Sequence, residues 1–95
     1  MSVNVAVAVG PVVAGLLGLA TPTLSIALGD DRPATLGDVV GALEAHAPGA
    51  LVEPRTGALR RHIHVRVNRQ PVARLDHVLR ADDRIRVDMR MIESG

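Results

Sequence analysis

The residues whose chemistry stands out lie at the end of the sequence, where an alternating stretch leads to a terminal glycine. From Arg84 to Met91, apolar residues alternate with arginine or aspartate, a period of two that is typical of a strand with one face in a core. We expect this strand to hold the chain up to about Met91 and to leave residues 92–95 as a tail, namely Ile92, Glu93, Ser94 and Gly95. Because glycine lacks a Cβ atom, the carboxylate of Gly95 could enter a narrow site that excludes a branched residue.

Two other groups of side chains could do chemistry, but each has a simpler interpretation. His62 and His64 would leave the same face of a strand and could share a metal, yet only His77 could supply a third imidazole, so we expect structural or surface histidines and no metal site. Asp82 and Asp83 could form an acid–base pair, although adjacent acids in a turn usually cap or shape that turn. The sequence shows no Ser-His-Asp order and no phosphate loop. We therefore expect no self-contained enzymatic activity.

The composition excludes several classes of function. The chain has 95 residues, enough for one small domain, with no cysteine and no aromatic residue. A disulfide, a thiolate nucleophile and a zinc–thiolate site are therefore excluded, as is the aromatic stacking that single-stranded nucleic acids usually require. The lack of cysteine fits a cytoplasmic protein, which is our expectation.

The charge is unevenly distributed. The formal net charge is +1, yet ten of the eleven basic residues lie between Arg55 and Arg90, a span that contains four acids. Arg84, Arg86 and Arg90 would share the strand face opposite the core, where they could present charge to a partner enzyme or simply be solvated. Without a recognition helix or an aromatic platform, we do not expect a nucleic-acid partner.

The first 28 residues contain a long uncharged stretch that must be weighed as a membrane span. No basic residue precedes it, and the pairs at 10–11 and 21–22, Gly-Pro and Thr-Pro, interrupt it, so we expect a hairpin of two strands and no membrane partner. Between the strands, Pro11 and Gly18 suit the start and end of a short helix. Its apolar residues would either cover one end of the core or form an exposed contact for a partner; they are Val12, Val13, Leu16 and Leu17.

The rest of the chain predicts one main helix and three more strands. Thr35 and Asp38 resemble a capping box, and the following apolar residues recur at helical spacing up to Ala47. Alternation predicts a strand over residues 63–67, a turn at 68–69 and a short edge strand over 71–75. The fold class is therefore α+β, a mixed sheet of four to five strands packed on one main helix. Residues 1–91 would form the domain, and residues 92–95 the tail.

Three short segments carry a resemblance to a known family. They are ATLGDVVGAL at residues 34–43, VRVNRQ at 65–70 and LRADDRI at 79–85. Their order and spacing resemble those of the ubiquitin-like β-grasp sulfur carriers, namely the small subunit of molybdopterin synthase and the thiamine-pathway carrier. The resemblance covers nearly the whole chain.

This resemblance implies a carrier function for the C-terminus. Gly95 would be activated as an acyl-adenylate by an adenylating, E1-like partner that uses ATP, and then converted to a thiocarboxylate for a sulfur-accepting enzyme subunit. The chain itself would bind no cofactor. The family ends in Gly-Gly, whereas this chain has Ser94 before its last glycine, and Arg69 and Asp82 replace glycines often found in the two turns. The alternative is a β-grasp module that docks a partner enzyme without activation of its C-terminus.

Overall fold

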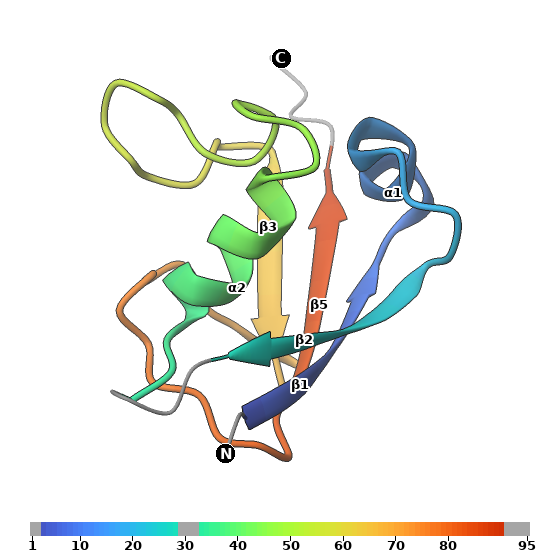
Figure 1. Ribbon diagram of the computed structural model, residues 1–95. Coiled ribbons are helices and arrows are strands. Elements are labelled where there is room, and N and C mark those ends of the chain that lie inside the picture. The colour runs from blue at the N-terminus through green and yellow to red at the C-terminus, as the bar shows by residue number, and fades with distance from the viewer. Residues whose placement is uncertain (1–2, 29–32, 91–95) are drawn as a thin grey trace.

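The computed structural model describes residues 3–28 and 33–90, which form a five-stranded mixed sheet with two helices (Figure 1). The strands are β1 (Val3–Val9), β2 (Thr23–Leu28), β3 (Ile63–Val67), β4 (Gln70–Pro71) and β5 (Arg84–Met89). The helices are α1 (Pro11–Leu17) and α2 (Leu36–Glu44). The predicted α+β class and β-grasp architecture are confirmed.

The order of strands across the sheet is β2-β1-β5-β3-β4, which places the last strand in the middle. β1 and β2 form the predicted antiparallel hairpin, with Val3 opposite Leu28 and Ala8 opposite Thr23. β5 pairs in parallel with β1 and antiparallel with β3. β5 is therefore hydrogen-bonded on both sides, to β1 and to β3.

All strands except β4 contribute apolar side chains to one core. The buried residues of β1, β3 and β5 alternate along each strand; they are Val5, Val7, Val9, Ile63, Val65, Val67, Ile85 and Val87. α2 lies across this face and buries its own apolar residues, Leu36, Val39, Val40 and Leu43 (Figure 1). No polar or charged residue is buried within the described ranges. The opposite face of the sheet carries no helix and is called the open face below.

The two helices begin as the sequence predicts. Pro11 stands at the first position of α1, and Gly18 ends that helix in the left-handed conformation, with φ of 68°. At the start of α2, the Asp38 carboxylate accepts a hydrogen bond from the Thr35 backbone N–H at 2.9 Å. Neither helix of the described residues is long and apolar enough to span a membrane.

One partly buried interaction could not be predicted from local sequence. The Glu44 carboxylate, at the end of α2, accepts hydrogen bonds from the backbone N–H groups of Gly49, Leu51 and Val52, at 3.0, 2.7 and 3.3 Å. Burial is the largest influence on the pKa of Glu44 and raises it, but these hydrogen bonds and the nearby Arg60 together lower that pKa below its ordinary value. Glu44 therefore fixes the loop after α2 in its charged form.

The structure corrects one boundary. The edge strand predicted over residues 71–75 is only Gln70–Pro71, although the Val72 N–H still donates to the carbonyl of Val65 at 2.9 Å. Proline cannot donate a backbone hydrogen bond, which limits the pairing of this edge. β5 ends at Met89, and the predicted extension to Met91 and the tail over 92–95 fall outside the described residues.

Candidate functional site

The strand that leads to the C-terminus is held in the centre of the sheet. Its residues Ile85 and Val87 are 2% and 0% exposed. Pairing with β3 continues to its end, where Met89 lies opposite Ile63 and the Arg90 N–H donates to the carbonyl of His62 at 2.8 Å. The chain is thus anchored to the last described residue. The tail residues predicted to act beyond it, Ile92, Glu93, Ser94 and Gly95, lie outside the described residues, so their roles stay predictions.

The short helix α1 divides its apolar residues between the core and the surface. Val13 and Leu17 are 0% and 3% exposed, whereas Val12 and Leu16 are 57% and 46% exposed. Val13 and Leu17 therefore cover the core, whereas Val12 and Leu16 are exposed and their contact with a partner stays a prediction. Val13 and Leu17 are core residues, which corrects their inclusion in a contact surface. Val12 and Leu16, four residues apart, stand on one exposed helical face.

The exposed pair lies close to the end of β5. α1 packs against β5, and the Gly10 N–H, just before the helix, donates to the carbonyl of Val87 at 2.9 Å (Figure 1). A Cβ added at Gly10 would meet the Asp88 carboxylate, so a larger residue there would require the Asp88 side chain to turn away. A protein that received the C-terminus could also contact Val12 and Leu16.

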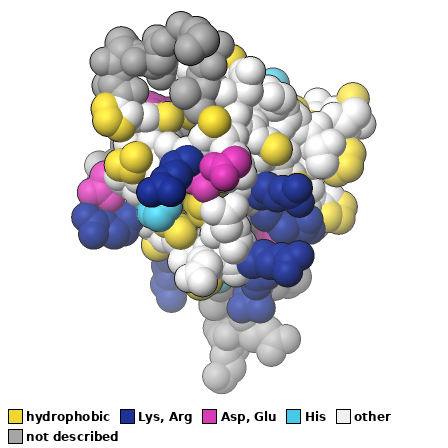
Figure 2. Space-filling view, turned by 90° about the horizontal axis from the view of Figure 1, so that it is seen from below, with side chains coloured by type: hydrophobic (Ala, Val, Ile, Leu, Met, Phe, Trp, Pro, Cys, Tyr) yellow, Lys and Arg dark blue, Asp and Glu magenta, His cyan; other side chains and the backbone are white. Residues whose placement is uncertain are grey.

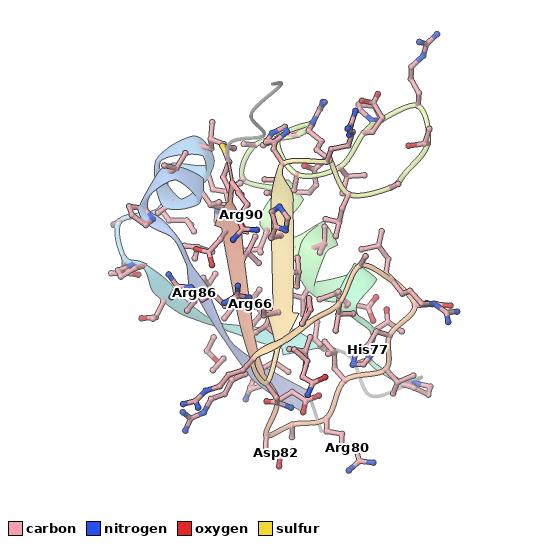
Figure 3. The ribbon with its side chains drawn as sticks, turned by 180° about the vertical axis from the view of Figure 1, so that it is seen from behind. Arg66, His77, Arg80, Asp82, Arg86 and Arg90 are labelled. Carbon is pink, nitrogen blue, oxygen red and sulfur yellow. The ribbon has the colours of Figure 1, made fainter. Side chains whose placement is uncertain are left out.

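The predicted arginines of β5 are all exposed. Figure 3 shows Arg86 and Arg90 on the open face of the sheet, with Arg66 of β3 beside them. The Arg86 guanidinium donates to the Asp88 carboxylate at 2.8 Å, with 52% and 35% of the two side chains exposed. The structure thus adds Arg66, which the sequence alone does not single out because its cross-strand neighbours depend on the register.

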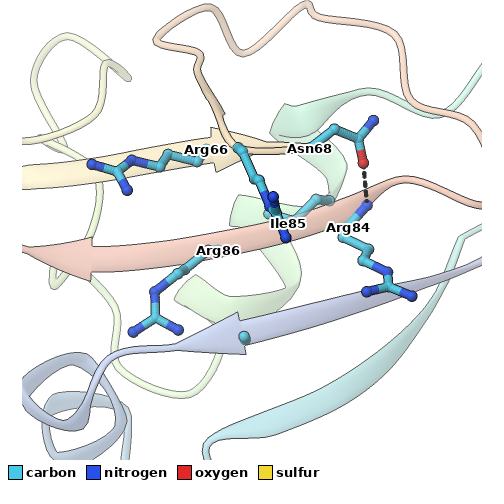
Figure 4. Close-up of a pocket in the computed structure, with 7 residues that line it drawn as sticks. Arg66, Asn68, Arg84, Ile85 and Arg86 are labelled. Atoms are coloured by element: carbon cyan, nitrogen blue, oxygen red, sulfur yellow. Dashed lines mark hydrogen bonds between the residues drawn. The ribbon is translucent and has the colours of Figure 1, made fainter.

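A shallow hollow of about 350 Å³ lies on the open face (Figure 4). It has Ala8 and Ile85 among its lining residues, together with Asn68 and four arginines, Arg66, Arg69, Arg84 and Arg86. We call it the arginine hollow. Of its four arginines, the sequence alone predicts Arg84 and Arg86 as partner contacts. Arg69 could have been found from its place in the predicted turn after β3, where an arginine follows an asparagine.

Hydrogen bonds fix the turn at one side of the arginine hollow. The Asn68 side chain accepts from the Arg84 backbone N–H at 2.9 Å and donates to the Asp83 carboxylate at 2.8 Å. Asp83 also accepts from the Arg80 backbone N–H at 2.8 Å, and this bond, followed by that from Asn68, lowers the pKa of Asp83 despite an opposing effect of burial. Asp83 therefore shapes the turn, as expected of acids in this position, while Asp82 is exposed.

The histidines do not form a recognisable metal site. Residues 3–28 and 33–90 contain no group of three or more histidine, aspartate or glutamate side chains that could hold a metal ion. His64 lies opposite Asp88 in the pairing of β3 and β5. His77 lies at the end of the molecule that carries Arg80 and Asp82, whereas Arg90 lies at the opposite end (Figure 3).

Comparisons with known proteins place the fold. No family model matches the sequence, and no curated protein matches it. Among solved structures, SAMP1 from Haloferax volcanii is 22% identical, with a TM-score of 0.73 over 97% of this chain and 99% of its own. CysO from Mycobacterium tuberculosis is 26% identical, with a TM-score of 0.69 over 92% of this chain and 99% of its own.

A third solved structure extends the same comparison. The molybdopterin converting factor, subunit 1, from Pyrococcus furiosus is 18% identical, with a TM-score of 0.68 over 95% of this chain and all (100%) of its own. These neighbours are ubiquitin-like β-grasp carriers, so the resemblance seen in the three sequence segments is confirmed. They are small carrier proteins and not catalysts.

Proposed function

We propose that this chain is a sulfur carrier whose C-terminal Gly95 is adenylated and then converted to a thiocarboxylate. In the first step, the Gly95 carboxylate attacks the α-phosphorus of ATP on a partner enzyme and releases pyrophosphate. A sulfur nucleophile from a donor then displaces AMP and leaves sulfur on the glycine carbonyl. An acceptor enzyme subunit would consume the thiocarboxylate in the biosynthesis of a cofactor or metabolite, as a molybdopterin-synthase small subunit does.

The observation that carries this proposal is the central position of β5. The strand is paired with β1 as far as Val87 and with β3 as far as Met89, so the body of the protein presents the following residues from a fixed point. Five residues, 91–95, follow the last described one, and an extended chain of that length can span at most about 17 Å. Such a reach would let the body dock outside a partner's active site while Gly95 enters it.

The exposed face of α1 supports docking close to that point. Val12 and Leu16 present apolar surface beside the end of β5, where a partner holding the C-terminus would also lie. A CysO protein from Amycolatopsis orientalis, 20% identical to this chain, has been solved in complex with BexX, so a neighbour of this fold does bind a partner protein. By analogy, we propose that an adenylating, E1-like enzyme and a sulfur-accepting subunit bind this chain.

An intact mass spectrum tests the proposal. The protein would be incubated with its candidate adenylating enzyme, ATP and a sulfur donor, beside a variant that lacks Gly95. We expect one terminal oxygen to be replaced by sulfur in the full chain and not in the variant, although the variant should fold normally because a tail buries little surface. An unchanged mass with a partner enzyme that is active on another carrier would contradict the proposal.

A second candidate function is a docking module without carrier chemistry. Ser94 stands where the carriers have their penultimate glycine, and it adds a Cβ atom and a hydroxyl to any narrow channel. The exposed Val12 and Leu16 would serve docking equally well without activation. Binding to the adenylating enzyme with no change in mass would favour this function.

A further inference from the structure

The open face of the sheet brings arginines together without matching acids. In the antiparallel pairing of β3 and β5, Arg66 lies directly opposite Arg86. On the other side of β5, Ala6 lies beside Arg84 and Ala8 beside Arg86, so β1 offers only methyl groups. Like charges placed directly opposite each other across strands are destabilising. This arrangement therefore lowers the free energy of unfolding, and an aliphatic or acidic residue in place of Arg66 or Arg86 would avoid that loss.

The arginine hollow contains no acid among its lining residues. Asp88, nearby on β5, pairs with Arg86. Within the part of the chain that the structure describes, Arg66, Arg69 and Arg84 make no side-chain hydrogen bond or ion pair. The guanidinium groups are exposed, and several arginine side chains gather on one side of the molecule (Figure 2). Three unpaired guanidiniums thus remain available to an anionic partner.

The backbone of Arg69 provides a second, independent observation. Asn68 and Arg69 connect β3 to β4 with positive φ at both residues, 52° and 72°. A two-residue hairpin turn of this kind favours Asn followed by Gly, because glycine adopts positive φ without steric cost. Asn68 fits, but arginine is unfavourable at the second position. Since this costly residue adds the fourth guanidinium to the arginine hollow, strain at this turn points to a binding role.

We propose that the arginine hollow and its surroundings bind an extended acidic segment of a partner protein. Arg66 and Arg84, both unpaired, are diagonal neighbours across β3 and β5, about 7–8 Å apart, and alternate carboxylates of an extended peptide lie about 6.8 Å apart. Guanidinium groups match carboxylates in geometry and can bind them through two parallel hydrogen bonds.

The distribution of these groups favours an acidic peptide over the other anions. The arginines are spread along two strands and a turn and do not converge on one point, as a site for a single phosphate would require. The chain has no aromatic residue on which a nucleic-acid base could stack, and neither helix of the described residues lies on the open face.

This inference adds to the proposed function the chemistry of the partner surface, which would be acidic. It rests on the proposed function only for the identity of the partner. The arginine hollow lines the start of β5, whereas the C-terminus follows its end. Binding of an acidic peptide can therefore be measured with no adenylating enzyme and no change at Gly95. Failure of peptide binding would leave the carrier proposal intact, and failure of adenylation would leave this one intact.

The experiment measures binding of a fluorescent hexaglutamate peptide to the full chain by anisotropy. We expect Arg66→Ala and Arg84→Ala each to weaken binding about three- to fivefold, the double variant about tenfold or more, and added salt to weaken it further. Arg55→Ala is the matched control, because it removes the same charge from an exposed loop residue away from the open face, and it should bind as the wild type does.

A further variant separates binding from folding. Arg69→Gly should raise the melting temperature, because it relieves the positive φ, and should still weaken peptide binding. Loss of binding in a more stable protein cannot result from misfolding.

Tripolyphosphate and a short DNA duplex serve as the other probes. The proposal is overturned if hexaglutamate does not bind, if its binding is unchanged in the Arg66→Ala/Arg84→Ala variant, or if only the phosphate probes bind through these arginines.

Discussion

Arg66 of β3 and Arg86 of β5 face each other directly across an antiparallel pair of strands, on the one face of the sheet that no helix covers. The Asp88 carboxylate pairs with Arg86, while Arg66 makes no ion pair within the described residues. The repulsion between these two like charges lowers the free energy of unfolding of the isolated protein. It therefore supplies a direct test of whether the open face is arranged for binding.

Arg66→Glu should stabilise the protein. The new carboxylate would face Arg86 across the strands and replace repulsion with attraction, which should raise the free energy of unfolding by about 0.5–1 kcal/mol. Urea denaturation at neutral pH measures the change, with Arg66→Gln as a control that should give a smaller gain. A loss of stability in the glutamate variant would show that repulsion at this pair is negligible.

Arg69→Gly should also stabilise the protein, by a separate mechanism. Glycine removes the steric cost of positive φ but increases the entropy of the unfolded chain, and we expect a net gain of about 0.5–1 kcal/mol. Arg55→Gly is the control, because Arg55 has no positive φ and glycine there can only add unfolded-state entropy. Equal effects of the two substitutions in thermal or urea denaturation would contradict the strain assigned to the turn.

Glu44→Gln should destabilise the protein at neutral pH, by about 2 kcal/mol, because a neutral amide accepts the three backbone hydrogen bonds more weakly. The folded pKa of Glu44 lies below its ordinary value near 4.5. Its contribution is therefore fully present above pH 4.5 and is lost as pH falls through the folded pKa.

The gap in stability between wild type and Glu44→Gln should accordingly narrow as the solution is acidified from about pH 7 to about pH 3. Urea midpoints across this range measure it. A gap that stays constant or widens toward low pH would mean that the charge of Glu44 does not hold the loop.

Leu16 and Leu17 should respond in opposite ways to substitution. Leu17→Ala should lower the free energy of unfolding by about 2–4 kcal/mol, because it leaves a cavity in the core. Leu16→Asp should change stability by no more than about 0.5 kcal/mol, because the side chain is exposed, and it should weaken binding to the adenylating partner. Calorimetry measures the stability of both variants, and a pull-down measures binding of Leu16→Asp to the adenylating partner. Unchanged binding would show that α1 is not part of the docking surface.

Much of the fold follows from local patterns in the sequence. Alternation at residues 63–67 and 84–89 predicts both strands and assigns Ile85 and Val87 to the core, because successive strand side chains point to opposite faces. Thr35 and Asp38 predict the start of α2, and Pro11 and Gly18 bound α1, since each satisfies a local backbone requirement. Exposure of Arg84 and Arg86 follows from the same alternation.

The tertiary structure decided which residues become neighbours. Four similar apolar residues precede Gly18, and only the packing of α1 against the sheet separates buried Val13 and Leu17 from exposed Val12 and Leu16. Arg66 meets Arg86 only because β3 and β5 pair in one register, and a shift of either strand by one residue would have moved that strand's arginine to the core face. Contacts between residues distant in the chain depend on this register and packing, which local propensity does not encode.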